Sequence, residues 1–161
     1  MAVKYTPESL LPALRLFIDA RNKANAAGFP DNGGAIHSVE RILDMLCIRV
    51  KYGLTHVNNL KKLLYAECSI GARHALLNGD IHLLRIEHVL PQRAFAKQII
   101  DLVSLGATDR EVVAYIQQHY RLVLLDVEET RLLNSLNRSN ITANRLSDAG
   151  IVMFYGPVQK V

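Results

Sequence analysis

The sequence is poor in the features that mark secreted, membrane-spanning or repetitive proteins. No apolar run approaches the roughly 18 residues needed to cross a bilayer. Glu8 precedes the first apolar stretch and no small-residue cleavage site follows, so we expect neither a secretory signal nor a membrane span. Low-complexity segments are missing, and so are repeats with a period of about 20–50 residues.

Cysteine is also scarce. The chain has 2 cysteines, Cys47 and Cys68, and their spacing is not that of metal ligands. We therefore expect reduced thiols in the core and a cytoplasmic location. Five scattered histidines form no H-x-x-x-H pair and are expected at surface or core positions; they are His37, His56, His74, His82 and His119.

The chain has 161 residues, of which 50% are hydrophobic, and this favours one domain with a sizeable core. The net charge of +4 permits nucleic-acid binding without requiring it. The most basic stretch, residues 49–62, is either a phosphate-contacting surface or the solvated face of two helices. Its charged side chains are Arg49, Lys51, Lys61 and Lys62.

Helix signals fill the first half of the chain. Thr6 can cap a helix with Pro7 at its first position, and the segment 26–34 is rich in breakers. A second helix is predicted from Ser38 to Gly53, a third from about 55 to 68, and a fourth within 69–79.

The second half alternates strands and helices. Residues 81–90 and 121–126 read as strands. Between them we predict a helix from Pro91 to Gly106 and another that starts at the capping box 108–111. Asp126 can cap a last helix, 127–137, whose predicted apolar face consists of Leu132, Leu133 and Leu136. The fold class is thus α+β and mostly helical, with a two-stranded ββα-metal-like finger in the C-terminal half.

One strand carries an adjacent acid and imidazole, Glu87 and His88. In a ββα-metal finger, a histidine at the end of the first strand acts as general base on water, and the closing helix supplies groups four residues apart. Here that helix offers Thr130 and Asn134. Adjacent strand residues point to opposite faces, so Glu87 and His88 share a site only if the strand ends or bulges there, which Pro91 favours.

Several stretches resemble a known family. The segment "IEHVLP" (86–91) is similar to the E-H-[IV]-x-P start of many HNH (His-Me finger) endonuclease domains. One bacterial HNH-like group is resembled by "SIGARHALLNG", "TDREVVAYI", "RLVLLD", "VEETRLLN" and "NRLSDAGI". The resemblance covers roughly residues 69–151. It divides a single domain, 1–161, into a helical N-terminal part (1–68), the HNH-like part and a tail (152–161), in which 153–158 forms a short strand or a packed extension.

The resemblance implies a nuclease that hydrolyses phosphodiester bonds of DNA or RNA. His88 would be the general base, Glu87 a metal ligand or the residue that orients the metal's water, and Asn134 the metal ligand or support on the helix. Mg²⁺ or Mn²⁺ would suit these oxygen ligands. The expected partner is nucleic acid, with a protein partner also open and no membrane.

The sequence also departs from the family's pattern. Thr130 stands where many relatives have His, Asn or Asp, no asparagine directly precedes the second strand, where Tyr120 and Arg121 stand, and no CxxC pair braces the finger. The alternative is therefore a catalytically inactive HNH-like protein that binds nucleic acid or a protein partner in a regulatory role.

Structural roles also remain open for the individual residues. His88 can be an ordinary strand histidine, Glu87 can pair with Arg85 or Arg93, and Asn134 can be a simple exposed residue. Glu128 and Glu129 are expected to stabilise the start of their helix rather than to bind metal.

Overall fold

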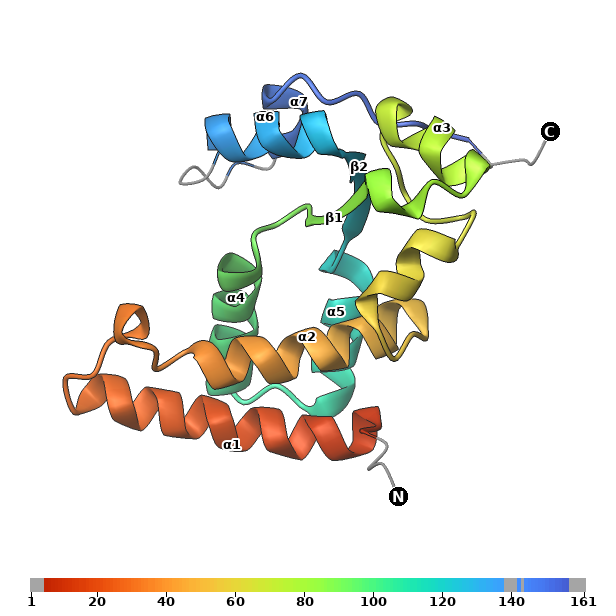
Figure 1. Cartoon of the computed structure of the whole chain (residues 1–161). Helices are drawn as coiled ribbons and strands as arrows, with labels where there is room; N and C mark the ends of the chain where they lie inside the picture. The colour runs from red at the N-terminus through yellow and green to blue at the C-terminus, as the bar shows by residue number, and fades with distance from the viewer. Residues whose placement is uncertain (1–4, 138–141, 143, 157–161) are drawn as a thin grey trace. The chain divides into compact units, whose positions relative to one another are not determined.

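The computed structural model describes residues 5–137, 142 and 144–156 (Figure 1). These residues are mostly helical with one two-stranded antiparallel sheet, which confirms the predicted α+β class. None of the helices in the described part of the chain is both long and apolar enough to cross a membrane.

The chain forms two compact units. The helical unit contains the described part of residues 1–55 together with Gln92–Tyr120. The sheet unit contains His56–Pro91 together with the described part of residues 121–161. The chain therefore enters each unit twice, and the segment between the two strands belongs to the helical unit.

The helical unit contains α1 (Pro7–Ala26), the 3-10 helix η1 (Asp31–Gly33), α2 (His37–Tyr52), α4 (Gln92–Ser104) and α5 (Asp109–His119). Its helix starts follow the sequence signals: Thr6 caps α1, and Thr108 caps α5. The predicted stop at Gly53 is confirmed, because this residue has a φ of 65° and ends α2. The core side chains come from all four α-helices and include Leu10, Leu14, Val39, Leu46, Phe95, Ile99 and Ile116.

The sheet unit contains η2 (Val57–Lys62), α3 (Ile70–Asn78), η3 (Ile81–Leu83), β1 (Leu84–His88), β2 (Leu122–Asp126), α6 (Val127–Asn137) and α7 (Arg145–Asp148). Strands β1 and β2 run antiparallel, with Leu84 opposite Asp126 and His88 opposite Leu122. The predicted strand 81–90 is thus shorter than expected, since its first residues form η3.

Strand β2 lies at the centre of the hydrogen-bonding in this unit. On the edge away from β1, the Leu124 amide donates to the Glu67 carbonyl (2.8 Å) and the Ser69 amide donates to the Leu124 carbonyl (3.0 Å). The predicted helix 55–68 is therefore wrong beyond η2. Pairing with the otherwise open edge of β2 satisfies the backbone groups of Glu67 and Ser69, and this tertiary pairing overrides the local helical pattern.

The two faces of the sheet are both covered. Four consecutive β2 residues, 122–125, are buried, although successive side chains point to opposite faces. One face packs in a cluster formed by Val123, Leu125, Leu133, Leu146, Ala149 and Ile151. Because Leu133 belongs to α6 and Leu146 to α7, these two helices cover that face.

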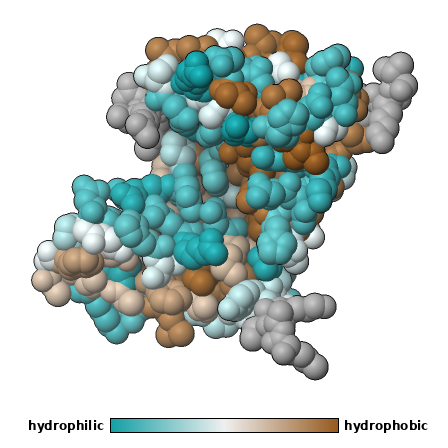
Figure 2. All heavy atoms as spheres, viewed as in Figure 1, coloured by the Kyte–Doolittle hydropathy of each residue, from teal (hydrophilic) through white to brown (hydrophobic). Residues whose placement is uncertain are grey.

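Only part of the predicted apolar face of α6 is buried. Leu133 is fully buried, whereas Leu132 is 43% and Leu136 is 56% exposed. The helix meets the sheet through a narrow stripe centred on Leu133, and Leu132 is displaced from it by about 100° round the helix. In Figure 2, hydrophobic atoms reach the surface of the sheet unit. Of the predicted tail strand, Met153 makes a bridge with Ser69, and residues 157 and 158 lie outside the described residues.

Both cysteines are buried and free, as predicted. Cys47 lies in α2, and burial raises the pKa of its thiol. Cys68 lies beside Leu124 in the sheet unit. The two residues therefore belong to different units and act as apolar core groups.

Candidate active site at the end of β1

Glu87 and His88 are the last two residues of β1. Residues directly opposite each other in an antiparallel pair share a face of the sheet. Glu87 is opposite Val123 and so lies on the face covered by α6 and α7, whereas His88 is opposite Leu122 on the other face. The hydrogen bonds between the two strands end immediately after them, with the Val89 amide donating to the Arg121 carbonyl (3.1 Å). The pair therefore sits at the strand end, as the sequence suggested.

The Glu87 carboxyl lies in a half-buried position. Burial raises the pKa of Glu87, and the nearby charges of Arg145 and His88 partly offset that rise. Of the two arginines considered as partners of Glu87, Arg93 donates to Glu40 within the helical unit (2.8 Å). Arg85 donates to the carbonyls of His82 and Leu84. Glu87 thus stands in an environment of reduced dielectric, near the positive charge of Arg145.

Arg145 is a site residue that the sequence analysis did not single out. It is the first residue of α7 and only 7% exposed. One of its guanidinium nitrogens, Nη1, donates to the His88 carbonyl at 2.7 Å. The segment 144–151 gives a weak signal for this contact: an arginine stands beside leucine, alanine and isoleucine that prove to be core residues.

Helix α6 carries the other two residues considered for the site. Thr130 is half-buried, and its hydroxyl oxygen is buried with no hydrogen-bond partner among the described residues. Asn134 is exposed, one turn further along the helix. Helical geometry puts these two side chains on one stripe of α6, next to the stripe of Leu133 that packs on the sheet.

A second set of contacts fixes where α6 begins. The Glu129 amide donates to Asp126 Oδ1 (2.8 Å), and the Asp126 amide donates to Glu129 Oε2 (2.9 Å). Ser69, which caps α3, also donates its hydroxyl to Glu129. The capping box expected for Glu129 is therefore present, and it is tied to the start of α3.

Gly71 brings α3 close to this capping box. A Cβ atom at Gly71 would stand 2.5 Å from Asp126 Oδ2 and 2.7 Å from Glu129 Oε1. A side chain of any size would collide there. The absence of a side chain thus allows α3 and the start of α6 to approach closely.

The fit of a metal ion rests on a small donor set. Glu87 would supply a carboxylate and Asn134 an amide oxygen, and Mg²⁺ commonly keeps several waters and binds through one or two carboxylates. Across residues 5–137, 142 and 144–156, no three His, Cys, Asp or Glu side chains gather into a metal site. The donor chemistry at Glu87 therefore fits a weakly held, largely hydrated ion and not a closed structural one.

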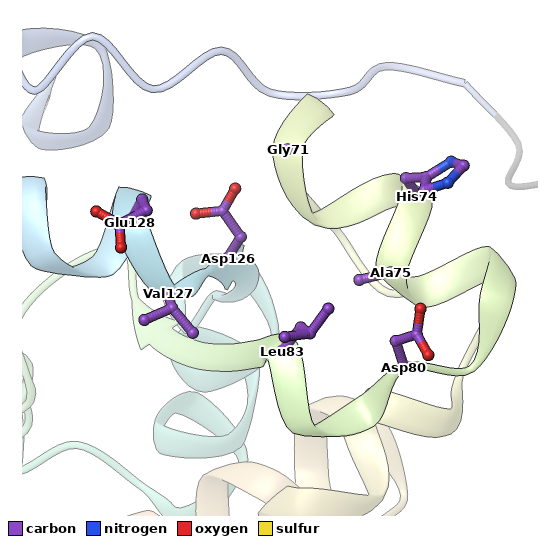
Figure 3. A pocket seen from close by; sticks show the side chains of 8 residues that line it. All are labelled: Gly71, His74, Ala75, Asp80, Leu83, Asp126, Val127 and Glu128. Carbon is purple, nitrogen blue, oxygen red and sulfur yellow. The ribbon is translucent and has the colours of Figure 1, made fainter.

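A separate cavity of about 290 Å³ lies at the other end of the β1–β2 pair (Figure 3). Leu83 and Val127 line it, together with the acids Asp80, Asp126 and Glu128. The cluster of carboxylates disfavours a phosphate ligand. The cavity is distinct from the strand end that carries His88, because its lining lies at the end where Leu84 pairs with Asp126.

The basic stretch 49–62 is divided between the two units. Arg49 donates to the carbonyls of Tyr5 and Met45, and Lys51 donates to the Gln117 carbonyl. These two side chains thus serve contacts within the helical unit. A phosphate-contacting role stays a prediction for Lys61 and Lys62 on η2.

Comparison with known proteins adds no relative to this description: no protein-family model, no curated protein and no solved structure matches the chain. The functional argument therefore starts from the strand end itself, where Glu87 and His88 follow one another on opposite faces of the sheet and Arg145 bonds to the His88 backbone carbonyl.

Proposed function

We propose that the protein is a metal-dependent nuclease of the HNH type that hydrolyses phosphodiester bonds in DNA or RNA. The observation that carries this proposal is the order and pairing of the sheet unit. Two antiparallel strands are followed at once by a capped helix, and an acid–histidine pair stands at the end of the first strand. This order of elements supports the proposal, which requires the Glu87 and His88 side chains, on opposite faces of the sheet, to reach a common site at the strand end.

In this reaction His88 accepts a proton from a water molecule. The water oxygen forms a bond to phosphorus, and the bond from phosphorus to the leaving sugar oxygen breaks. A positioned histidine is suited to this step because its ordinary pKa lies near neutral pH. The half-buried position of His88 at the strand end leaves part of the residue accessible.

Glu87 and Asn134 would hold the ion. When bound, a divalent ion polarises the phosphate and stabilises the charge on the leaving oxygen. Glu87 favours a cation because burial disfavours an isolated negative charge, which a cation neutralises. Asn134 brings a neutral oxygen from the exposed surface of α6.

The nuclease reading is tested by assaying plasmid DNA and RNA with Mg²⁺ or Mn²⁺. We expect cleavage by the wild type and a loss of roughly 100- to 10,000-fold in His88→Ala, as for the removal of a general base. His82→Ala is the matched control, since His82 is an exposed histidine in the same unit. Equal rates for the wild type and His88→Ala would refute the proposal, as would inactivity of both.

Metal binding is tested separately by thermal unfolding. A ligand of the native state stabilises it, by about 2.7 kcal/mol at a free concentration about 100 times its Kd. We expect Mn²⁺ to raise the Tm of the wild type and to raise it less in Glu87→Gln and Asn134→Ala. Ser135→Ala is the control on α6, because Ser135 is exposed and its hydroxyl donates to the Leu132 carbonyl of its own helix.

A second function, regulatory binding without catalysis, is supported by two observations on α6. The hydroxyl at position 130 is a poor metal ligand, and Leu132 and Leu136 present apolar surface. This reading predicts no metal-dependent rise in Tm and no cleavage. It also predicts that Leu132→Ser with Leu136→Ser weakens binding to nucleic acid or to a protein partner while the fold is kept, as measured by circular dichroism.

A further inference from the structure

We infer that Arg145 is a positioning residue that clamps the end of β1 and so fixes Glu87 and His88 in place. The inference rests on the proposed function for its catalytic consequence. Its structural part concerns the strand end alone and has its own measurement.

The clamp acts on the backbone of His88. Nη1 of Arg145 donates to the His88 carbonyl at 2.7 Å, which is the length of a charge-assisted hydrogen bond. This carbonyl belongs to the last residue of β1, where the next ladder bond, from the Val89 amide to the Arg121 carbonyl, is longer (3.1 Å). Strand ends fray most readily, so a charged donor at this point restrains the residue that most needs a fixed position.

Helix α7, which carries Arg145, is anchored on the sheet. Leu146, the next residue, packs in the cluster with Val123 and Leu133, and Ile151 returns its amide to the Leu146 carbonyl at 3.0 Å. Gly150, with a φ of 74°, permits the turn that brings Ile151 back. The short helix is thus anchored by apolar contacts on the same sheet face as Glu87.

Stability alone is a poor explanation for a cation at this position. Burying a charge costs free energy, and an apolar residue of similar volume often serves a core equally well or better. Arg145 is 7% exposed beside an apolar cluster. The guanidinium therefore has a use that an apolar residue could not replace, the hydrogen bond to the His88 carbonyl at the end of β1.

The test compares Arg145→Met and Arg145→Lys with the wild type. Arg131→Met is the matched control, because Arg131 is an arginine of the same unit whose side chain is 74% exposed. Amide hydrogen exchange of Val89 reports on the strand end, and the Leu124 amide, bonded to Glu67 on the other edge, is the internal reference. Nuclease assays with Mg²⁺ or Mn²⁺ give kcat and KM for each variant.

We expect Arg145→Met to lose protection at Val89 but not at Leu124, and to lower kcat roughly 100-fold with little change in KM, the effect of a slightly misplaced catalytic group. Arg145→Lys should show protection at Val89 and a kcat between those of the wild type and Arg145→Met. If Arg145→Met does not fold, the comparison is made with Arg145→Lys alone. Arg131→Met should match the wild type.

The outcomes separate the two proposals. Unchanged protection at Val89 in both Arg145 variants overturns the clamp. Lost protection with an unchanged kcat overturns its catalytic role. If the wild type cleaves nothing, the nuclease proposal and the catalytic part of this inference fail together, and the exchange at Val89 alone decides whether Arg145 clamps the strand.

Discussion

Two helices of this protein begin with the same local motif but use it differently. At α5, Thr108 and Glu111 exchange hydrogen bonds with each other's backbone amides, and the whole motif is exposed. At α6, Asp126 and Glu129 make the same exchange. The second motif also receives the hydroxyl of Ser69 and lies against Gly71 of α3.

The difference lies in the surroundings of the motif. In the α5 motif, Thr108 and Glu111 bond to each other at their own helix end, so its loss affects one turn. The α6 motif joins the helix that carries Asn134 to the helix that precedes β1. A capping box can thus be a tertiary contact, and its energetic weight depends on burial and partners more than on its sequence.

Gly71→Ala should have the largest effect. Alanine ordinarily favours a helix over glycine, but here its Cβ would collide with Asp126 Oδ2 and Glu129 Oε1. Relief requires these hydrogen-bonded carboxylates to move, so we expect a loss of about 3 kcal/mol in the free energy of unfolding, measured by urea denaturation. Adding Asp126→Ser, which keeps a capping oxygen and removes Oδ2, should restore part of the loss. A more stable Gly71→Ala protein would contradict the close approach.

Glu129→Ala should follow. It deprives the Asp126 amide and the fully buried Ser69 of their charged acceptor. Hydrogen bonds to charged groups contribute roughly 1.5–3 kcal/mol, so we expect a loss of about 2 kcal/mol. The matched variant is Glu111→Ala in the exposed motif. If the two variants unfold at the same urea concentration, the α6 motif does not stabilise the protein more than the α5 motif does.

Thr108→Ala should cost about 1 kcal/mol, the usual effect of losing a helix cap. Because the bonds that Thr108 makes with its side chain join it to Glu111 in the same turn, the loss should be confined to α5. Hydrogen exchange should therefore speed up in the first turn of α5 and leave the amides of α6 unchanged. Faster exchange in α6 would show that the exposed motif reaches further than its contacts indicate.

Lowering the pH should have the smallest effect, because it changes only the contribution of Glu111 to the stability of the α5 motif. The backbone amide and then the hydroxyl of Thr108 lower the pKa of Glu111 from its ordinary value of 4.5. A carboxyl whose pKa is lowered in the folded state stabilises the fold above its ordinary pKa, and this contribution is lost as pH falls through the lowered value. The Tm difference between the wild type and Glu111→Gln should therefore be present at about pH 7 and shrink towards about pH 3. A Tm difference that grows as the pH falls would contradict a lowered pKa of Glu111 in the folded protein.

Local signals in the sequence predicted the features that depend on neighbouring residues. Both capping boxes, the start of α1 at Thr6 and the end of α2 at Gly53 could be read from residue types within one turn. The strand positions of Glu87 and His88 followed from β-forming neighbours and from Pro91. These features were predictable because each involves only a few adjacent residues.

Features that depend on distant partners could not be read in this way. The segment before Ser69 has a helical pattern, but the open edge of β2 takes up its backbone groups. Leu132 and Leu136 looked like core residues because periodicity does not reveal how wide the buried stripe is. Gly71 and Arg145 matter only through contacts with residues far along the chain, at Glu129 and His88.

The insertion of residues 92–120 between the two strands has a consequence for folding kinetics. In a hairpin, two strands joined by a short turn can pair rapidly from that turn. Here the segment that contains α4 and α5 lies between β1 and β2, so the two strands pair across a long loop. Closing so long a loop costs conformational entropy, which raises the folding barrier, and it gives the strand pair a high contact order. The hydrogen bond between Val89 and Arg121 marks where the two ends meet, so a tight turn joining these residues would convert a slow, long-range pairing into a fast, local one.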